Sequence, residues 1–290
     1  MSEYHSIWKY LFRTPHKLGW VDVEGVRTRY LEAGPADAPT VILLHGSSGS
    51  LEYFCANIAE YSKHFRVLAV NMMGSGWTDR PDYPYTPDVY REHVRGFMDA
   101  MGVQRASLVG VALGSAIAVH VAHTHPQRVD KVVMVSPGAI ISDPEDMAQF
   151  VSGIKDRRKA AVDELSWDNV HKIFAKLMLK EESVMDDLVA VRLAIYSEGD
   201  IERHMRNMMS SAGPQLCLEH DQWRQLQTPL LVFAAVDSPN MFLRNARLIG
   251  QLAPNATVVD VSGCRIWAHY EQAQRFHETS IPFLRGQVPA

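Results

Sequence analysis

The stretch Ser-Leu-Val-Gly-Val-Ala-Leu-Gly-Ser-Ala, residues 107–116, decides how the rest of the chain is interpreted. A β-branched, apolar run leads to Gly110, and small residues typical of a closely packed helix follow Gly114. Glycines flank a single residue in this way where a strand turns sharply and the helix after it must approach the strand closely. The stretch therefore predicts a strand, a tight turn with Ala112 at its apex, and a helix packed on a sheet.

The regions around this turn alternate β-rich runs with helical patterns, which is typical of a mostly parallel sheet flanked by helices. Thr86 and Pro87 predict a helix start, with Thr86 as N-cap and Pro87 in the first helical position. Further helices are expected at 115–123, 242–252 and 270–284. Strands are expected at 26–31, 40–44, 65–70, 106–111, 130–135, 230–235 and 256–261.

The segment 141–224 follows a different pattern, because β-rich runs disappear, charge density rises and methionines collect. We interpret it as a helical lid inserted into a core domain of residues 1–140 and 225–290. Flexible methionine side chains suit an adaptable apolar wall over a pocket, and core packing inside the lid explains them equally well. The methionines are Met147, Met178, Met185, Met205, Met208 and Met209.

The composition limits the partners that the protein can have. Of 290 residues, 47% are hydrophobic and 21% charged, with a formal net charge of −4, so neither nucleic acid nor a membrane surface is an expected partner. Cys55, Cys217 and Cys264 are widely spaced, which argues against a disulfide framework or a zinc site and fits a reducing cytoplasm. The start of the chain lacks a signal-peptide pattern, and the longest apolar stretch, 108–122, is too short for a membrane helix. We expect a soluble, cytoplasmic protein without metal or cofactor.

The order of these parts resembles the α/β-hydrolase fold over nearly the whole chain. The loop at His45-Gly46, the turn at 110–114, the lid, an acid after a late strand and the last strand come where that fold has them. The turn corresponds to its nucleophile elbow, a strained turn that presents a catalytic serine. The resemblance implies a mostly parallel, eight-stranded-type sheet with helices on both faces and a helical lid.

Within that fold the chain is most similar to the C–C hydrolases that act on ring-cleavage products in aromatic degradation. Asp237 follows the strand 230–235, where this family has G-x-x-D with its catalytic acid. Residues 263–268, Gly-Cys-Arg-Ile-Trp-Ala, resemble the family's G/R-C-G-H-W-A. Residues 186–192 resemble a lid segment whose arginine, here Arg192, binds the substrate carboxylate. The resemblance implies a small-molecule carboxylate substrate and, since related enzymes are often dimers, a homodimer.

The chain departs from this family at the residues that transfer protons. Ala112 replaces the nucleophilic serine, and Val111 replaces the asparagine before it. Ile266 replaces the catalytic histidine, beside Arg265 in place of glycine. Neither alanine nor isoleucine can transfer a proton or bond covalently to a substrate, so ordinary Ser-His-Asp hydrolysis is not expected. A laboratory serine-to-alanine change would explain Ala112 alone, whereas the other replacements favour a site repurposed by descent.

Other parts of the site are expected to remain. The backbone N–H groups of Ser47 and Leu113 would donate to an oxyanion, because that role needs main chain and no particular side chain. The resemblance makes Arg192 and Asp237 the candidate catalytic residues. The expected pocket is lined by Ser48, Ala112, Arg192, Ile266 and Trp267.

Three further residues have two interpretations each. His269 lies three residues after Ile266, and a shifted loop would let it replace the missing base. Cys264 is either a thiolate that adds reversibly to a conjugated double bond or a buried, inert cysteine. We interpret His45 as a structural residue of its loop rather than a catalyst.

Three functions are consistent with these residues. The first is a non-hydrolytic enzyme that isomerises, tautomerises or decarboxylates a carboxylate-bearing dienoate, or acts on it as a lyase. The second is an inactive protein that binds such a molecule. The third is a hydrolase or esterase that uses His269, or an engineered inactive C–C hydrolase. We favour the first, because carboxylate binding and enolate stabilisation need neither the serine nor the histidine.

Overall fold

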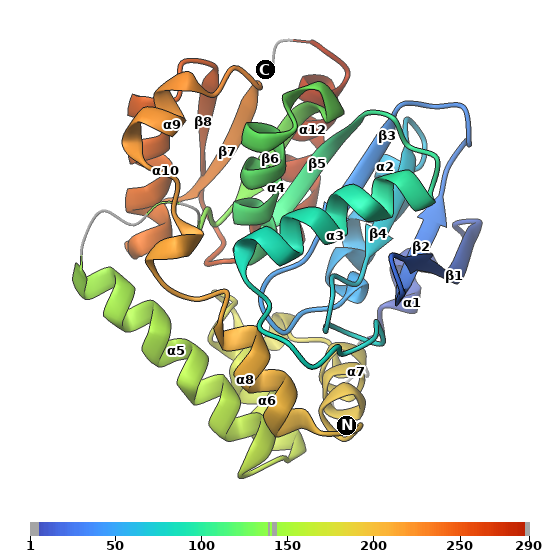
Figure 1. The fold of residues 1–290 in the computed structure, drawn as a ribbon, viewed down its shortest axis with the longest axis vertical. Coiled ribbons are helices and arrows are strands. Elements are labelled where there is room, and N and C mark those ends of the chain that lie inside the picture. The colour runs from blue at the N-terminus through green and yellow to red at the C-terminus, as the bar shows by residue number, and fades with distance from the viewer. Residues whose placement is uncertain (1–5, 139, 141–143, 288–290) are drawn as a thin grey trace.

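The fold is built on one sheet of eight strands, shown in Figure 1. A computed structural model describes residues 6–138, 140 and 144–287, and inside α5 it describes only some of the side chains. The strand order is β1-β2-β4-β3-β5-β6-β7-β8, in which β2 is antiparallel to both of its neighbours and the strands from β4 to β8 run parallel. The strands are β1 His16–Val23, β2 Val26–Ala33, β3 Thr40–Leu44, β4 Arg66–Val70, β5 Ala106–Val111, β6 Val129–Val135, β7 Leu230–Ala235 and β8 Ala256–Val261.

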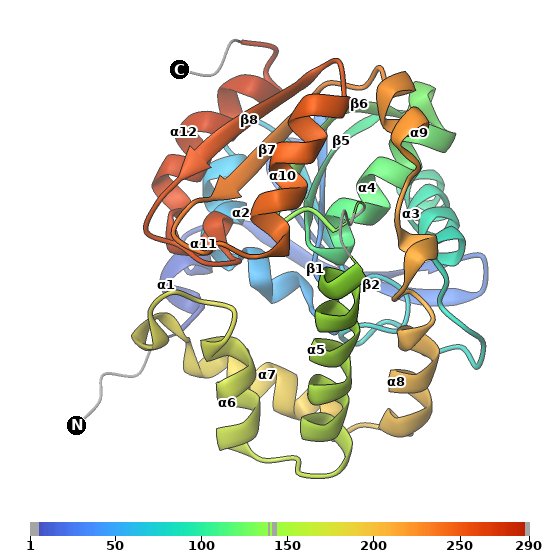
Figure 2. The same ribbon diagram turned by 90° about the vertical axis from the view of Figure 1, so that its left-hand side faces the viewer.

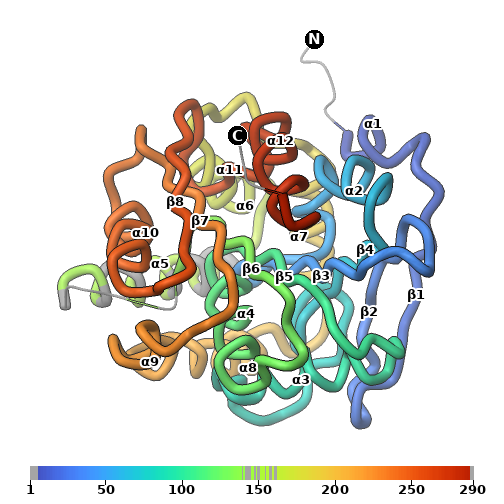
Figure 3. The backbone as a smooth tube through the Cα atoms, turned by 90° about the horizontal axis from the view of Figure 1, so that it is seen from above, coloured from blue at the N-terminus to red at the C-terminus, as the bar shows by residue number. Residues whose placement is uncertain are grey.

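Helices cover both faces of this sheet. The pair α3 and α4 packs on one face and the pair α2 and α12 on the other (Figure 3). The helices α5 to α8, which follow β6, lie together beyond one end of the sheet (Figure 1 and Figure 2). The helices are α1 Trp8–Leu11, α2 Cys55–Tyr61, α3 Pro87–Ala100, α4 Leu113–Thr124, α5 Pro144–Val162, α6 Trp167–Ala175, α7 Asp186–Tyr196, α8 Ile201–Met209, α9 His220–Gln225, α10 Met241–Leu252, α11 Ala268–Glu271 and α12 Ala273–Leu284, with 3₁₀ turns at Leu51–Phe54, Pro126–Arg128, Glu181–Ser183 and Pro214–Leu216.

The middle strands are buried between these helix layers. Every residue of β5 is buried, as expected for a parallel strand that is covered on both faces. The carboxyl ends of β3, β5 and β6 meet at one edge of the sheet, because these strands run side by side in the same direction. In open α/β sheets the loops at that edge form the binding crevice.

Most strands lie where the sequence predicts them. The bounds of β3, β5, β7 and β8 are confirmed, and those of β2, β4 and β6 differ by one or two residues. Thr86 caps α3 as expected, since its hydroxyl accepts a hydrogen bond from Val89 N at 3.3 Å. The sequence does not predict β1, because this edge strand alternates poorly and forms by pairing with β2 along its whole length.

The prediction of one closing helix over 270–284 is wrong. The chain forms α11 and α12 instead, with a break at Gln272, whose φ is −121° and ψ is 44°. The Gln272 side chain donates a hydrogen bond to Gly263 O at 2.8 Å. This contact to the loop before α11 accompanies the interruption of the helix.

Between β6 and β7 the described residues form helices and 3₁₀ turns and no strand, in keeping with the expected helical insertion. The domain boundaries at 140 and 224 stay a prediction. Met178, Met185, Met205 and Met208 are buried, so they pack inside the structure, whereas the side chain of Met147 lies outside the described part. Within the described residues no helix combines the length and the apolar character that crossing a membrane requires.

Candidate active site

The turn between β5 and α4 has the geometry of a nucleophile elbow. Ala112 occupies its apex with φ +50° and ψ −109°, a conformation that residues other than glycine rarely adopt. A Cβ atom on Gly110 would lie 2.4 Å from the carbonyl carbon of Gly114, and one on Gly114 would lie 2.0 Å from the carbonyl oxygen of Leu44. The turn therefore needs both glycines, as the sequence predicts, and it presents only the methyl group of Ala112.

A cavity of about 250 Å³ lies at this turn. Its walls come from the loop and the 3₁₀ turn after β3, the end of β5, α5, the segment after α6, α7, the start of α10 and the segment before α11. Ala112, Arg192, Ile266 and Trp267 are among the residues that line it. The described lining residues are Gly46, Ser47, Tyr53, Val111, Ala112, Gly153, Leu177, Arg192, Asn240, Met241, Phe242, Ile266 and Trp267.

The loop after β3 gives its two serines different roles. Ser47 lines the cavity, whereas the hydroxyl of Ser48 is buried against the sulfur of Met208 at 3.4 Å. The expectation that Ser48 lines the pocket is therefore wrong, because its side chain packs against α8. Within the described residues, the backbone N–H groups of Ser47 and Leu113 have no hydrogen-bond acceptor. The N–H of Leu113 is the first of α4 and has no partner within its helix, so it is free to bind a ligand oxygen.

Arg192 is buried in the cavity wall without a charged partner. Its exposed fraction is 3%, no described carboxylate pairs with it, and its Nη1 has no hydrogen-bond acceptor. Burial lowers the pKa of the guanidinium, an effect that the Tyr196 hydroxyl opposes. Because an isolated buried charge is costly, an anionic group in the cavity would be stabilised here.

Three aromatic rings surround this guanidinium. Its Cζ lies 4.7 Å from the ring centre of Phe174, 5.3 Å from that of Tyr53 and 5.6 Å from that of Tyr196. Cation–π attraction of this kind fixes the position of a guanidinium without neutralising its charge. The ring of Tyr53 packs in turn on Trp267, with 4.5 Å between ring centres. The cavity therefore combines apolar walls with one oriented cation.

The helix that carries Arg192 is attached to the rest of the protein at both ends. Near the start of α7, Asp187 Oδ2 accepts a hydrogen bond from Ile7 N at 2.9 Å. At the other end, Arg80 Nη2 donates to Ile195 O at 2.8 Å, where a cation also suits the negative end of the helix dipole. These contacts hold α7, and with it Arg192, in one position relative to the elbow.

Two residues expected at the site lie outside the described cavity lining. Asp237 is exposed, and its Oδ2 accepts a hydrogen bond from Gly263 N at 2.6 Å. Within the described residues its carboxylate is hydrogen-bonded to this loop and to no histidine. Cys264 is fully buried, and burial raises the pKa of its thiol to about 12. The structure therefore contradicts the hypothesis that Cys264 acts as a thiolate nucleophile.

His269 does not replace the missing base. Its ring is fully buried and lies 5.3 Å from that of Phe54 and 5.6 Å from that of Trp267, and it is absent from the described cavity lining. Burial lowers its pKa to about 3, and neither ring nitrogen has a hydrogen-bond partner within the described structure. The hypothesis of a catalytic site at His269 is therefore wrong in its geometry: the shift of the loop that it needs does not occur.

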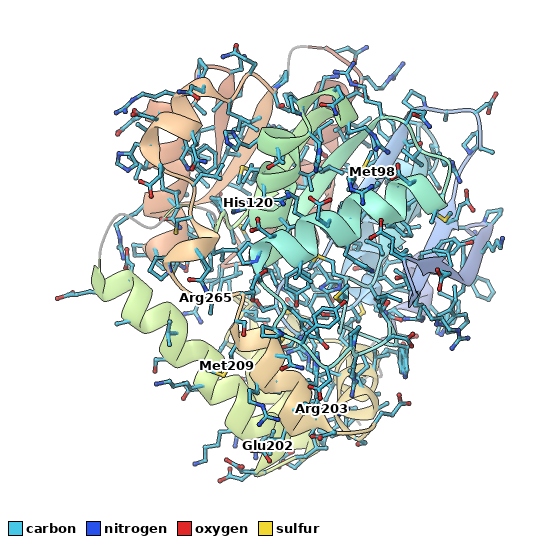
Figure 4. The ribbon with its side chains drawn as sticks, in the orientation of Figure 1. Met98, His120, Glu202, Arg203, Met209 and Arg265 are labelled. Carbon is cyan, nitrogen blue, oxygen red and sulfur yellow. The ribbon has the colours of Figure 1, made fainter. Side chains whose placement is uncertain are left out.

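Two other histidines have structural hydrogen bonds. His45 Nδ1 donates to Gly46 O at 2.8 Å and its Nε2 accepts from Met72 N at 3.0 Å, so both nitrogens are used, as its structural interpretation requires. On α4, His120 binds Leu216 O through Nε2 at 3.0 Å (Figure 4). Across the described part of the chain, no three His, Cys, Asp or Glu side chains gather in a way that could hold a metal ion.

Sequence reasoning missed several cavity residues. Asn240 begins α10 as its N-cap, accepting a hydrogen bond from Phe242 N at 2.9 Å, and both residues line the cavity with Met241. The pattern of a capping residue before an apolar run could have located this helix start. Tyr53 follows the loop at His45 by eight residues, and nothing in its local sequence marks it as a cavity residue.

Residues 39–165 match the family model described as alpha/beta hydrolase fold. This match, which covers less than half of the chain, and the order of the strands show that the chain has the alpha/beta hydrolase fold. Its relatives and structural neighbours include meta-cleavage product hydrolases of aromatic degradation, in agreement with the resemblance seen in the sequence.

Three similar proteins show the degree of similarity in sequence and in structure. The 2-hydroxy-6-oxo-6-(2'-aminophenyl)hexa-2,4-dienoic acid hydrolase of Metapseudomonas resinovorans is 26% identical over 275 residues, which span 91% of this chain and 90% of that protein. The structure of the 2-hydroxy-6-oxo-6-phenylhexa-2,4-dienoate hydrolase from Rhodococcus sp. strain RHA1 superposes with a TM-score of 0.79 at 20% identity, over 94% of this chain and 99% of that one. The carboxylesterase CesB (YbfK) of Bacillus subtilis gives a TM-score of 0.81 at 20% identity, over 97% and 96%. At these identities the two structural likenesses establish the fold alone.

Proposed function

We propose that this protein binds an unsaturated small molecule with a carboxylate, of the dienoate kind, and transforms it without hydrolysis. The observation that supports this is the content of one cavity: a buried, unpaired Arg192, two free backbone donors and an elbow that carries alanine. The relative from Metapseudomonas resinovorans is named as a hydrolase of such a dienoic acid. Our proposal differs from the activity in that name, because the carbon chain of the ligand stays intact.

The residues of the cavity have separate parts in this proposal. Arg192 holds the carboxylate through its planar fork. The N–H groups of Ser47 and Leu113 donate to a carbonyl oxygen of the conjugated chain and stabilise the enolate that develops on it. Tautomerisation, isomerisation, decarboxylation and lyase cleavage share this need for enolate stabilisation, and any proton that the ligand loses or gains is exchanged with water. Hydrolysis needs in addition an activated nucleophile, which Ala112 cannot supply.

The test is to incubate the purified protein with 2-hydroxy-6-oxo-6-phenylhexa-2,4-dienoate and to follow both the near-ultraviolet spectrum and the proton NMR spectrum. We expect the chromophore to change faster than in buffer, while every carbon of the substrate remains in one product. Arg192→Met should abolish the acceleration. Arg265→Met, which removes an arginine that does not line the described cavity, is the matched control and should retain it. Appearance of the two hydrolysis fragments would refute the non-hydrolytic proposal.

A second candidate is a binding protein without catalysis. It is favoured by the described cavity lining, which contains no His, Asp, Glu, Lys or Cys that could exchange a proton with a ligand. In that case the same dienoate would raise the melting temperature of the protein as its concentration increases. The spectrum of the dienoate would change no faster than it does in buffer. Any product formed faster than in buffer would exclude this candidate.

A further inference from the structure

The first helix, α1, exposes large apolar side chains on one side. Ile7, at its start, and Leu11 are buried where α1 packs on α2. Trp8 and Phe12 lie one helical turn apart and are therefore neighbours on the surface, where they are 55% and 78% exposed. Single exposed apolar residues are ordinary, whereas a group of them on one surface marks a site of interaction.

The edge strand β1 extends this apolar surface (Figure 1). Because side chains alternate along a strand, His16, Leu18 and Trp20 share one face of β1. Val23, on the other face, packs against α3. The centre of the Trp8 ring lies 6.2 Å from that of His16, so α1 borders the first face. The combined surface, which we call the α1–β1 face, exposes the apolar side chains of Trp8, Phe12, Leu18 and Trp20.

The α1–β1 face is also basic. Residues 8–20 include Lys9, Arg13 and Lys17 and no acidic residue. All three are exposed, and within the described structure none of them pairs with a carboxylate. Beside them, the Arg27 guanidinium lies 4.7 Å from the ring centre of Trp20. The net charge of −4, from which no membrane partner was expected, describes the whole chain and hides a local excess of positive charge at this face.

This combination favours an anionic lipid surface over a second copy of the chain. Tryptophan rings are enriched at the boundary between lipid headgroups and acyl chains, and lysine and arginine attract acidic headgroups. Two copies that met through this face would instead place like charges opposite one another. A hollow of about 490 Å³ lies on α1, and the described side chains that line it are aromatic or basic. An acidic headgroup is suited to such a hollow.

The α1–β1 face has a fixed position on the protein. Ser6 Oγ and Ile7 N donate hydrogen bonds to Asp187 Oδ2 on α7, at 2.6 and 2.9 Å, and β1 pairs with β2 along its whole length. A surface that is ordered before binding loses little conformational entropy when a partner covers it. The face can therefore bind without a prior folding step.

We infer that the α1–β1 face docks this protein on membranes that contain anionic lipids. Its apolar side chains enter the interfacial region of the bilayer, and its lysine and arginine side chains lie against the acidic headgroups. The inference is independent of the proposed function, since no residue of this face is among the described residues that line the cavity at the elbow.

The experiment measures binding to lipid vesicles by cosedimentation at about 0.15 M salt. One set of vesicles contains phosphatidylcholine alone, and the other contains phosphatidylcholine and phosphatidylglycerol in equal parts. The wild-type protein should bind the anionic vesicles about 100-fold more tightly, as about three cations at the surface imply. Trp8→Ala/Lys9→Gln should weaken binding to the anionic vesicles about 30-fold. Lys9→Gln/Arg13→Gln should reduce the preference for anionic vesicles to about fivefold.

Trp167 and Lys172, both on α6, provide a matched control. They are exposed and lie outside the α1–β1 face. Trp167→Ala/Lys172→Gln removes the same two kinds of side chain as Trp8→Ala/Lys9→Gln and should bind vesicles as the wild type does. Because all four residues are exposed, both double variants should keep the melting temperature of the wild type, which thermal unfolding checks.

Three results would overturn the inference. One is binding of the wild-type protein that is absent, or that is equal for the two kinds of vesicle. Another is a Trp8→Ala/Lys9→Gln variant that binds anionic vesicles as tightly as the α6 control does. The third is a wild-type dimer, detected by analytical ultracentrifugation, that Trp8→Ala/Lys9→Gln dissociates, because a second copy would then cover this face.

Discussion

Two walls of the cavity contrast in their chemistry: the elbow wall, formed by Val111 and Ala112, and the α7 wall, formed by Arg192. At the elbow wall, Ala112 stands in a strained conformation between two glycines that the turn requires, and its methyl group cannot transfer a proton. The α7 wall carries the buried guanidinium of Arg192, with which no described carboxylate pairs. Backbone geometry and side-chain chemistry can therefore change independently, because packing and hydrogen bonds maintain the turn whether or not a nucleophile stands on it.

The largest effect is expected from filling the elbow. Gly114→Ala places a Cβ atom 2.0 Å from the carbonyl oxygen of Leu44, in a contact between backbones that cannot move apart cheaply. We expect a loss of about 4 kcal/mol or more in the free energy of unfolding, measured by urea denaturation. Gly46→Ala is the control, since its Cβ atom would meet its nearest neighbour, Val111 O, at an ordinary 3.4 Å. Equal stability of the two variants would show that the elbow is not fixed by packing.

The next prediction concerns Arg192 and separates its effect on ligand binding from its effect on the stability of the protein. Arg192→Met should weaken the binding of 2-oxo-4-phenylbutanoate about 100-fold, equivalent to about 2.7 kcal/mol, because the ligand carboxylate loses a charge-assisted bidentate partner. The melting temperature of the unliganded variant should stay level or rise, since a costly buried charge is replaced by an apolar side chain. Calorimetry and thermal unfolding measure the two quantities. A variant that binds normally would place the carboxylate elsewhere.

A smaller effect concerns the histidine behind the elbow wall. Burial lowers the pKa of His269 to about 3, below its ordinary value near 6.5, so below pH 6.5 the unfolded chain takes up a proton that the folded chain refuses. His269 should therefore cost about 1.4 kcal/mol of stability for each pH unit between about 6 and the folded-state pKa. His269→Leu should flatten the decline in stability from pH 6 to pH 4, measured by urea unfolding at each pH. The control is His64→Gln at an exposed position. An unchanged slope in His269→Leu would mean that the ring is accessible to solvent.

The smallest effect tests the strain at the apex of the elbow. Ala112→Gly should raise the free energy of unfolding by about 1 kcal/mol, because glycine adopts φ +50° without the steric cost that a Cβ atom pays. Chemical denaturation of the two proteins provides the measurement. Destabilisation by the glycine would show that the methyl group of Ala112 contributes packing that outweighs its strain.

The sequence predicts the fold far better than the site. Local patterns sufficed for the central strands and for the elbow, since buried parallel strands and paired glycines leave strong signals. They did not suffice for β1, whose formation depends on pairing with β2. The pocket residues depend on how distant segments meet: Tyr53 approaches Arg192 across 139 positions of the sequence, and no local pattern encodes that approach.

His269 and Ser48 are residues that the sequence suggested for the site but that do not line the cavity. Both stand next to residues that line the cavity, yet His269 packs among aromatic rings and Ser48 against Met208. A change of one or two positions along a loop reverses the direction in which a side chain points. Proximity in sequence to a site residue is therefore weak evidence for a place in the site.

The backbone conformation of Ala112 bears on how this scaffold could be reused. The main chain at position 266 is also fixed, by hydrogen bonds from Ile266 N to Leu177 O at 3.0 Å and from the Ser136 hydroxyl to Ile266 O at 2.7 Å. The main chain is therefore held in place at both position 112 and position 266. For protein engineering, the chain offers a host into which a new reactive side chain can be placed at either position by substitution alone, in a cavity that Arg192 also lines.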